Sequence, residues 1–189
     1  MVSFVSPGAG WSEQDLDVQV LDGPPPSGFD CGRQEQNQFL YERAWRDQQL
    51  MASVTRLFFV KGILAAYVTT LADSIELGTR ENDRELRYPS IAALKIAQLA
   101  VDRSFAGSGL GRLLVSYVIQ YARRVGPDVG FRYVTLDARP ELEGWYAAQG
   151  FVRNKLVQKR RLEHARAKGH DEDEVAISMR FDLLEARRT

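Results

Sequence analysis

The chain has 189 residues, of which 44% are hydrophobic and 26% are charged. This composition excludes a wholly disordered chain and supplies enough apolar side chains for the core of one domain. The 25 basic side chains balance the 25 acidic ones, so the net charge gives no reason to expect nucleic acid and only a local basic patch would indicate it.

Cysteine usage and hydropathy favour a cytoplasmic location. Cys31 is the single cysteine, which excludes an intramolecular disulfide and is typical of a reducing compartment. We interpret it as a small buried residue rather than a nucleophile, because no histidine lies near it in the sequence. The first residues do not resemble a signal peptide. The longest uncharged, mostly apolar run, residues 62–72, is too short to cross a bilayer, so we expect no membrane association.

The ends of the chain differ in composition from its middle. Glycine and proline are frequent near the start, and we expect residues 1–15 to form a loosely ordered extension. No linker or internal repeat divides the rest, so residues 16–183 are expected to form a single domain. The last residues, 184–189, are expected to fray.

The first half of this domain predicts a strand, a helix and a hairpin. Apolar residues alternate with polar ones over residues 18–21, which predicts a short strand. Helical spacing of apolar side chains predicts a helix within residues 33–49, with Asp30 as its N-cap. Two β-rich runs on either side of Lys61-Gly62 predict a hairpin with a two-residue turn.

The next strand, predicted over Ile91–Val101, has an irregular apolar pattern. Leu94 and Ile96 share one parity, whereas Leu99 and Val101 share the other. Either both faces of the strand are buried, or one extra residue shifts the register between Ile96 and Leu99. A β-bulge makes such a shift and leaves backbone groups unpaired for a ligand. The pattern alone permits both.

A glycine-rich loop follows this strand and opens an amphipathic helix. Gly107, Gly109 and Gly111 stand at alternate positions. A strand, a glycine loop and a helix in this order aim backbone N–H groups and the positive end of the helix at a phosphate. The spacing differs from the G-x-G-x-x-G of dinucleotide-binding folds, and the lysine of a P-loop is absent. A purely structural turn would need only one or two glycines, so the pattern favours an anion site.

The remaining pattern completes an α/β fold with mixed strand pairing. Residues 153–174 combine a basic run with an acidic cluster, and we expect an irregular, solvated stretch that could also offer a basic patch. The other elements expected, in chain order, are a helix from Leu110 that ends at Gly126-Pro127-Asp128, a strand over residues 131–137, a helix from Pro140 to Gly150, a strand from Phe151 and a strand over residues 175–183.

The glycine loop resembles the pyrophosphate loop of the GCN5-related N-acetyltransferase (GNAT) family, which binds acetyl-CoA. The family's Q/R-x-x-G-x-G/A pattern corresponds to Ala106-Gly107-Ser108-Gly109-Leu110-Gly111 and departs from it at Ala106. The resemblance implies the GNAT acyl-CoA N-acyltransferase fold: a mixed central sheet with a bulged, splayed strand and flanking helices. It also implies that acetyl-CoA is held by Leu99, Ala100, Val101, Ala106, Gly107, Ser108, Gly109, Leu110, Gly111 and Arg112.

Tyr146 matches the second conserved feature of that family. It lies one helical turn before Gly150-Phe151, where the family places a tyrosine beside the thioester sulfur. The resemblance therefore implies that Tyr146 protonates the departing CoA thiolate as a general acid. The alternative is a core aromatic residue that packs beside Trp145.

The general base that would deprotonate the amine is not identified by the sequence. Glu76, Asp73 and Gln98 lie on or near the central strands and are candidates, and an ordered water is an alternative. By resemblance to the family, a backbone N–H near Val101 would bind the oxyanion of the tetrahedral intermediate.

The remaining polar residues give no clear indication of catalysis or metal binding. Asp137, near a strand end, is expected to cap or to bond backbone rather than to act in catalysis. His164 and His170 have no cysteine or clustered acid at ligand spacing, so we expect no metal site.

A narrower resemblance points to the GNAT-fold toxins of toxin–antitoxin pairs, which acetylate the α-amino group of aminoacyl-tRNA and block translation. It implies a tRNA partner, a neutralising antitoxin and a homodimer. Two interpretations stay open beside it: a GNAT enzyme that acts on a small-molecule amine or a protein amino group, and a non-catalytic acyl-CoA-binding protein. The matching segments are Phe29-Asp30-Cys31-Gly32 with Asn37, Phe39 and Leu40, Arg87-Tyr88-Pro89, Leu99-Ala100-Val101-Asp102 and Leu136-Asp137-Ala138.

Overall fold

The computed structural model describes residues 12–78 and 88–184. The predictions of a loosely ordered start and of a frayed C-terminus fall largely on residues 1–11 and 185–189, which lie outside the described residues, as do residues 79–87. They stay predictions.

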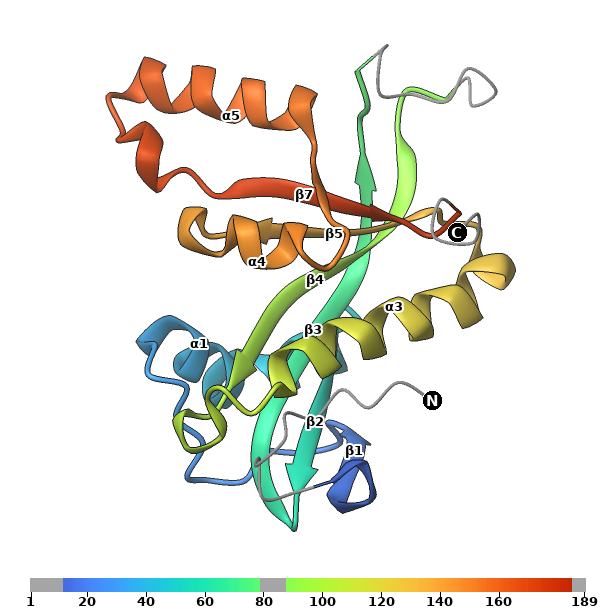
Figure 1. Cartoon of the computed structure of the whole chain (residues 1–189), viewed down its shortest axis with the longest axis vertical. Coiled ribbons are helices and arrows are strands. Elements are labelled where there is room, and N and C mark those ends of the chain that lie inside the picture. Colours follow the sequence, from blue (N-terminus) through green and yellow to red (C-terminus); the bar gives the residue numbers. More distant parts are fainter. Residues whose placement is uncertain (1–11, 79–87, 185–189) are drawn as a thin grey trace. The chain divides into compact units, whose positions relative to one another are not determined.

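The chain separates into two compact units; Figure 1 labels the helices and strands that form them. Strands β3 (Ile63–Ile75) and β4 (Ile91–Val101) and helix α3 (Leu110–Val129) contribute residues to both units. We call the two units unit I, made of residues 1–71 and 96–120, and unit II, made of residues 72–95 and 121–189.

Unit I contains the hairpin that the sequence predicts. Strand β2 (Val54–Val60) pairs antiparallel with β3, and Lys61 and Gly62 form the turn with φ angles of 50° and 79°. These positive values are those of a type I′ turn, which suits a two-residue hairpin. Strand β1 (Leu16–Val20) pairs antiparallel with β2 on its other edge. Both the hairpin and the short first strand are therefore confirmed.

In the described residues the strands follow the order β1-β2-β3-β4 in unit I and β4-β5-β7-β6 in unit II. Strands β4 and β5 are neighbours joined through helix α3, and a helical crossover of this kind joins parallel strands. Parallel and antiparallel pairs therefore occur together, which confirms the mixed sheet with flanking helices. The strands of unit II are β5 (Tyr133–Ala138), β6 (Val152–Arg153) and β7 (Ile177–Asp182).

The burial of β4 differs from the pattern expected from the sequence. Ile91 and Ala93 are buried on one parity, and Ile96 and Ala100 on the other. The change in burial therefore lies between Ala93 and Ile96, whereas Leu99 and Val101 are only half-buried. A β-bulge between Ile96 and Leu99 stays a prediction.

The helix predicted within residues 33–49 is present in three segments. They are α1 (Gln34–Gln38), a π-helical turn (Phe39–Arg43) and α2 (Ala44–Gln49). Asp30 is not the N-cap: Arg33 holds that position and makes no side-chain capping bond. The helix begins too far along the chain for Asp30 to reach its first turn as a cap, so the prediction was wrong in this respect.

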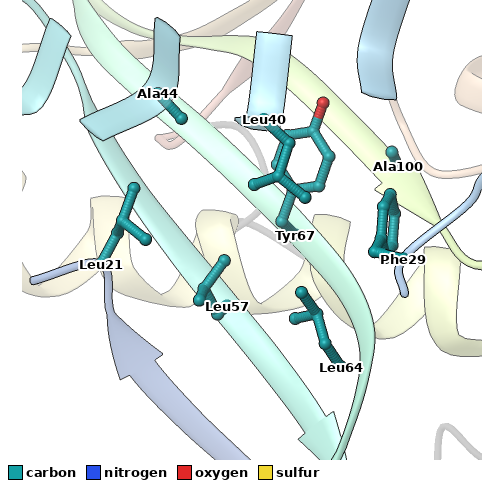
Figure 2. Packing of buried hydrophobic residues seen from close by; sticks show 8 residues of the cluster. All are labelled: Leu21, Phe29, Leu40, Ala44, Leu57, Leu64, Tyr67 and Ala100. Atoms are coloured by element: carbon teal, nitrogen blue, oxygen red, sulfur yellow. The ribbon is translucent and has the colours of Figure 1, made fainter. Parts of the chain in front are cut away.

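A hydrophobic cluster packs these helical segments against β2 and β3 (Figure 2). Tyr67 is fully buried at its centre, with its ring 5.5 Å from that of Phe29 and 6.3 Å from that of Phe39. Each large side chain buried here stabilises the fold by roughly 1.5–3 kcal/mol. The cluster consists of Leu21, Phe29, Leu40, Ala44, Leu57, Leu64, Tyr67 and Ala100.

Helix α3 continues past the predicted stop at Gly126-Pro127-Asp128. It ends at Val129, and the N–H of Gly130 donates to the carbonyl of Gly126 at 2.8 Å. Pro127 lies in the last turn, where its missing N–H costs one hydrogen bond at most. The sequence therefore correctly predicted that a glycine follows the helix, but the helix ends before Gly130 and not at Gly126.

Residues 153–174 are more regular than the sequence predicted. Most of them form helix α5 (Lys155–Lys168), which ends at Gly169 in the left-handed conformation. Leucine, lysine, arginine, glutamine and alanine favour a helix, but only Gln158 and Ala165 are buried. Because so few side chains face a core, the helix shows little hydrophobic periodicity, and the spacing of its apolar residues did not predict it.

The helix predicted from Pro140 is confirmed. A 3₁₀ turn (Pro140–Leu142) leads into α4 (Glu143–Ala147), which carries Tyr146. In the same unit, Arg132 makes a bidentate ion pair with Asp182, with its Nη2 2.6 Å from Oδ2. The two side chains are only 16% and 10% exposed, so this pair fixes the start of β5 against the end of β7.

Candidate functional site

The glycine loop of unit I is built directly onto the end of β4. Asp102 caps a 3₁₀ turn (Arg103–Phe105), since its Oδ1 accepts from the N–H of Ser104 at 2.9 Å. The loop then runs through the glycines to Leu110, the first residue of α3. The short capped turn fixes the direction in which the loop leaves the strand.

The backbone amides of this loop fall into two groups. Those of Ala106 and Ser108 donate to the carbonyls of Arg103 and Phe105, at 3.2 and 3.3 Å. Leu113 is the first residue of α3 to bond back along the helix, to Gly109. Among the described residues, no hydrogen-bond partner is found for five other amides, those of Gly107, Gly109, Leu110, Gly111 and Arg112. Five unpaired donors at a helix N-terminus are a binding site for an anion.

The conformation and charge of the loop suit the pyrophosphate of acetyl-CoA. Gly107 and Gly109 have φ angles of 74° and 88°, which other L-residues adopt only with strain. The first turn of the 20-residue helix α3 contains no acidic residue, so nothing there opposes the positive helix end. Within the described residues, the buried hydroxyl of Ser108 also has no partner. This set of donors fits a phosphate group.

The other residues predicted to bind acetyl-CoA lie on either side of this loop. Leu99 and Val101 are half-buried at the end of β4, and Ala100 is buried. The side chain of Leu110 is 1% exposed and belongs to the core, so this residue offers a ligand only its backbone. Arg112 is exposed on the first turn of α3.

Tyr146 is a buried residue of unit II. It is 8% exposed, and its ring makes edge-to-face contacts with Trp145 at 4.8 Å and Phe151 at 5.8 Å. Burial raises the pKa of Tyr146 to about 12, because the charged phenolate is poorly solvated there. The phenol therefore keeps its proton at neutral pH, which is the form that a general acid requires.

Gly150 shapes the chain directly after Tyr146. Its φ angle is 89°, and a Cβ at this position would lie 3.0 Å from Cε2 of Phe181. The turn allows the N–H of Phe151 to donate to the carbonyl of Tyr146 at 3.2 Å. A larger residue would push against β7 and move the end of the tyrosine helix.

A cavity of about 560 Å³ lies within unit II, between α5 and the sheet, and several charged side chains line it. Two of the candidate bases line it, and each is already bonded. Asp73 Oδ2 accepts from the hydroxyl of Thr135 at 2.8 Å, and Glu76 Oε2 pairs with Arg160 Nη1 at 2.5 Å. The third candidate, Gln98, belongs to unit I.

Asp137 makes contacts that differ from the prediction. It lies within β5 and bonds side chains instead of backbone: its carboxylate accepts from Lys95 Nζ and from Arg161 Nη1, both at 2.8 Å. Burial of this carboxyl acts to raise its pKa, but the hydrogen bonds from Arg161 and Lys95 outweigh that and lower the pKa of Asp137. A carboxylate held ionised by two cations is a weak base.

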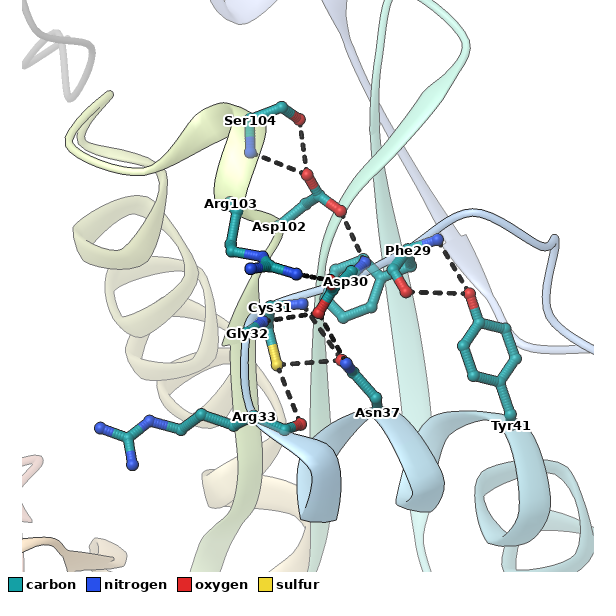
Figure 3. Close-up of polar contacts among 10 residues, drawn as sticks. All are labelled: Phe29, Asp30, Cys31, Gly32, Arg33, Asn37, Tyr41, Asp102, Arg103 and Ser104. Atoms are coloured by element: carbon teal, nitrogen blue, oxygen red, sulfur yellow. Dashed lines mark hydrogen bonds and ion pairs between the residues drawn. The ribbon is translucent and has the colours of Figure 1, made fainter.

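A polar cluster in unit I ties the loop before α1 to the start of the 3₁₀ turn (Figure 3). The Asp30 carboxylate forms an ion pair with Arg103 and accepts from the N–H of Gly32 and from Nδ2 of Asn37. The N–H of Asp30 donates to Asp102 Oδ2 at 2.7 Å. The sequence indicated this segment by resemblance only. Asp102 and Arg103 lie 72 and 73 positions from Asp30, so no local pattern connects them.

Cys31 belongs to the same cluster and is half-buried, not buried as predicted. Its Sγ lies 3.1 Å from Asn37 Oδ1. The polar surroundings explain why this cysteine does not enter the hydrophobic cluster next to it.

Metal-binding clusters and membrane-spanning helices are both absent from the described residues. Within residues 12–78 and 88–184, no three His, Cys, Asp or Glu side chains are grouped so that they could hold a metal ion. In the same residues, no helix combines the length and apolar character needed to span a membrane.

Comparison with known proteins places this site in context. The sequence model described as an acetyltransferase (GNAT) domain matches residues 31–162. A search of curated protein sequences gave no significant match. Similar solved structures include a tyrosine-to-phenylalanine mutant of KacT (TM-score 0.73, 18% identity, covering 93% of this chain and 99% of that chain) and AtaT complexed with acetyl-methionyl-tRNAfMet (0.73, 20%, 92% and 98%). Another is a mutant AtaT toxin bound to the C-terminus of the antitoxin AtaR and acetyl-CoA (0.67, 20%, 90% and 95%). At these identities the likeness shows the fold.

Proposed function

This chain belongs to the GNAT family of acetyltransferases, and from that premise we propose that it transfers acetyl from acetyl-CoA to the α-amino group of an aminoacyl-tRNA. The observation that carries the acetyl-CoA part is the glycine loop. It presents five unpaired amides at the start of α3 with no acidic residue in the first turn.

In this proposal the loop binds the pyrophosphate and the end of β4 binds the pantetheine arm. The amides of Gly107, Gly109 and Leu110–Arg112 donate to phosphate oxygens, and the positive end of α3 adds to the attraction. The backbone of Leu99–Val101 pairs with the arm as an added strand would. Ala106 supplies no side-chain donor, so this loop acts through its backbone.

Acetyl-CoA supplies a thioester whose carbonyl carbon accepts the nucleophile. The neutral amine nitrogen attacks this carbon, and an N–H near Val101 donates to the oxyanion that forms. The C–S bond then breaks, and the phenol of Tyr146 gives its proton to the departing sulfur. The amine proton passes to a base or water and from there restores the phenol of Tyr146, so the products are an acetylated amine and CoA with a protonated thiol. General-acid help of this kind is worth about 10²–10⁴ in rate.

The choice of aminoacyl-tRNA as acceptor rests on the fold-level likeness to AtaT, which has been solved with acetyl-methionyl-tRNAfMet. The same likeness supports a neutralising antitoxin partner, since AtaT is bound by the C-terminus of AtaR. A cytoplasmic location and a homodimer stay predictions of the sequence. Sedimentation of the purified chain would test the homodimer.

The test is transfer of radiolabelled acetyl to methionyl-tRNA by the purified protein. Deacylated tRNA and free methionine amide serve as controls for the RNA and for the amine. We expect label on methionyl-tRNA alone. Label on methionine amide at an equal rate would instead indicate a small-molecule acetyltransferase, and binding of acetyl-CoA without transfer to any amine would indicate a silent acyl-CoA-binding protein.

A further inference from the structure

We infer that Gln36 is a positioning residue for acetyl-CoA, because its side-chain amide holds the Leu99 carbonyl at the end of β4. The inference rests on the proposed acetyl-CoA site. Both residues belong to unit I. Gln36 Nε2 donates to the carbonyl oxygen of Leu99 at 3.1 Å, although the two residues are 63 positions apart.

The donor is itself fixed by the core of unit I. The main-chain carbonyl of Gln36 accepts from the hydroxyl of Tyr67 at 2.8 Å. Tyr67 is fully buried between Phe29 and Phe39, and burial raises the pKa of its phenol, so it remains a donor. The main chain of Gln36, from which the side chain reaches Leu99, is therefore held by packed residues and not by a solvent-exposed loop.

Asp30 holds the chain just after β4, at Asp102 and Arg103 (Figure 3). Its N–H donates to Asp102 at 2.7 Å, and its carbonyl accepts from the N–H of Arg103 at 3.0 Å. Bonds from outside the strand thus reach the segment at Leu99 and again at Asp102 and Arg103. Val101, near which the oxyanion would be bound, lies between the two anchors.

A ligand can use the Leu99 carbonyl while Gln36 holds it. A carbonyl oxygen has two lone pairs, so the bond from Gln36 leaves one for an amide of the pantetheine arm. A backbone that is fixed before binding does not have to be ordered by the ligand, and this increases affinity. Loss of the Gln36 amide should therefore weaken the hold on the arm and leave the nucleotide part of the ligand unaffected.

The experiment compares two ligands on matched variants. Gln36→Met removes the donor and keeps the length of the side chain, while Gln38→Met makes the same change at an exposed position of the same helix. Calorimetry measures acetyl-CoA and 3′-phospho-ADP, which is the nucleotide part of CoA without the arm. One lost hydrogen bond of about 1 kcal/mol predicts roughly fivefold weaker acetyl-CoA binding to Gln36→Met. We expect 3′-phospho-ADP to bind all variants within about twofold of wild type.

The outcomes separate the inference from the proposed function. Equal weakening of both ligands would mean general damage to the fold, and unchanged or tighter acetyl-CoA binding would mean that Gln36 does not hold the site; either result overturns the inference. Gln36→Glu is a second variant that keeps the reach but cannot donate, and it should weaken acetyl-CoA at least as much. Failure of the wild-type protein to bind acetyl-CoA would overturn the proposed function and the inference with it.

Discussion

Replacing Gly109 tests the anion loop most directly, because two variants of nearly equal shape differ only in charge. Gly109 precedes α3 with a φ angle of 88°. Asparagine and aspartate both tolerate this left-handed conformation better than other side chains, at a common cost of about 1–2 kcal/mol. Comparing Gly109→Asp with Gly109→Asn therefore cancels the strain and leaves the electrostatic effect on the ligand.

The size of that effect follows from the position of residue 109 among the unpaired amides. A carboxylate about 6 Å from one phosphate charge, at an effective dielectric constant of about 20, repels it by about 3 kcal/mol. This energy corresponds to a loss of about a hundredfold in affinity. The new charge would also offset the positive helix end. We therefore expect Gly109→Asp to bind acetyl-CoA about a hundredfold more weakly than Gly109→Asn at low salt.

Calorimetry with acetyl-CoA at low and high salt measures this difference, and circular dichroism checks that both variants fold. The gap between the two variants should shrink as salt rises, because ions screen a partly exposed charge. Equal affinities for the two variants at low salt would refute the placement of the pyrophosphate at this loop.

Three further predictions follow from the site and its surroundings. Tyr146→Phe should lower kcat by about 10²–10⁴ with acetyl-CoA affinity unchanged by calorimetry, and an unchanged kcat would make Tyr146 a core residue only. The pKa of Asp137 is lowered in the folded state. The ionised carboxylate therefore stabilises the fold above the unfolded-state pKa of about 3.9, and this stabilisation is lost as pH falls through the folded-state pKa. The melting temperature of Asp137→Asn should consequently depend less on pH below about 4 than that of wild type. Arg166→Ala should change the salt slope of tRNA binding by less than about one unit, because Glu172 already neutralises this arginine at 2.6 Å, and a loss of a full unit would show that it contacts a phosphate.

The sequence predicted elements well where the signal is local. The Lys61-Gly62 turn, the alternating strand that became β7 and the glycine loop each depend on residues adjacent in the chain. Pro127 misled the prediction because a proline in the last turn of a helix costs little, whereas the same residue two turns earlier would break it. Helix α5 was missed because it buries only Gln158 and Ala165.

The site was predicted only in part, because only some of its residues are close together in the sequence. The loop glycines lie within five consecutive residues, so their pattern is visible in the chain. The Gln36–Leu99 bond and the Asp30–Asp102–Arg103 cluster join residues 63 to 73 positions apart, and no periodicity reports such pairs. Helical spacing did place Gln36 on a helix, but its role depends on where the fold brings that helix.

The charges of α5 limit how this protein could recognise RNA. In the sequence the helix is the most basic stretch, yet each of its arginines is bonded within unit II. Arg160, Arg161 and Arg166 pair with Glu76, Asp137 and Glu172 at 2.5 to 2.8 Å. An arginine must leave its carboxylate before it can neutralise a phosphate, which reduces the gain that counterion release normally provides. With a net charge of zero as well, α5 would then contribute little to recognition of the RNA backbone, and an aminoacyl-tRNA acceptor would depend more on contacts to its aminoacyl end. A short RNA minihelix that carries the same aminoacyl group should then be acetylated nearly as well as the full aminoacyl-tRNA.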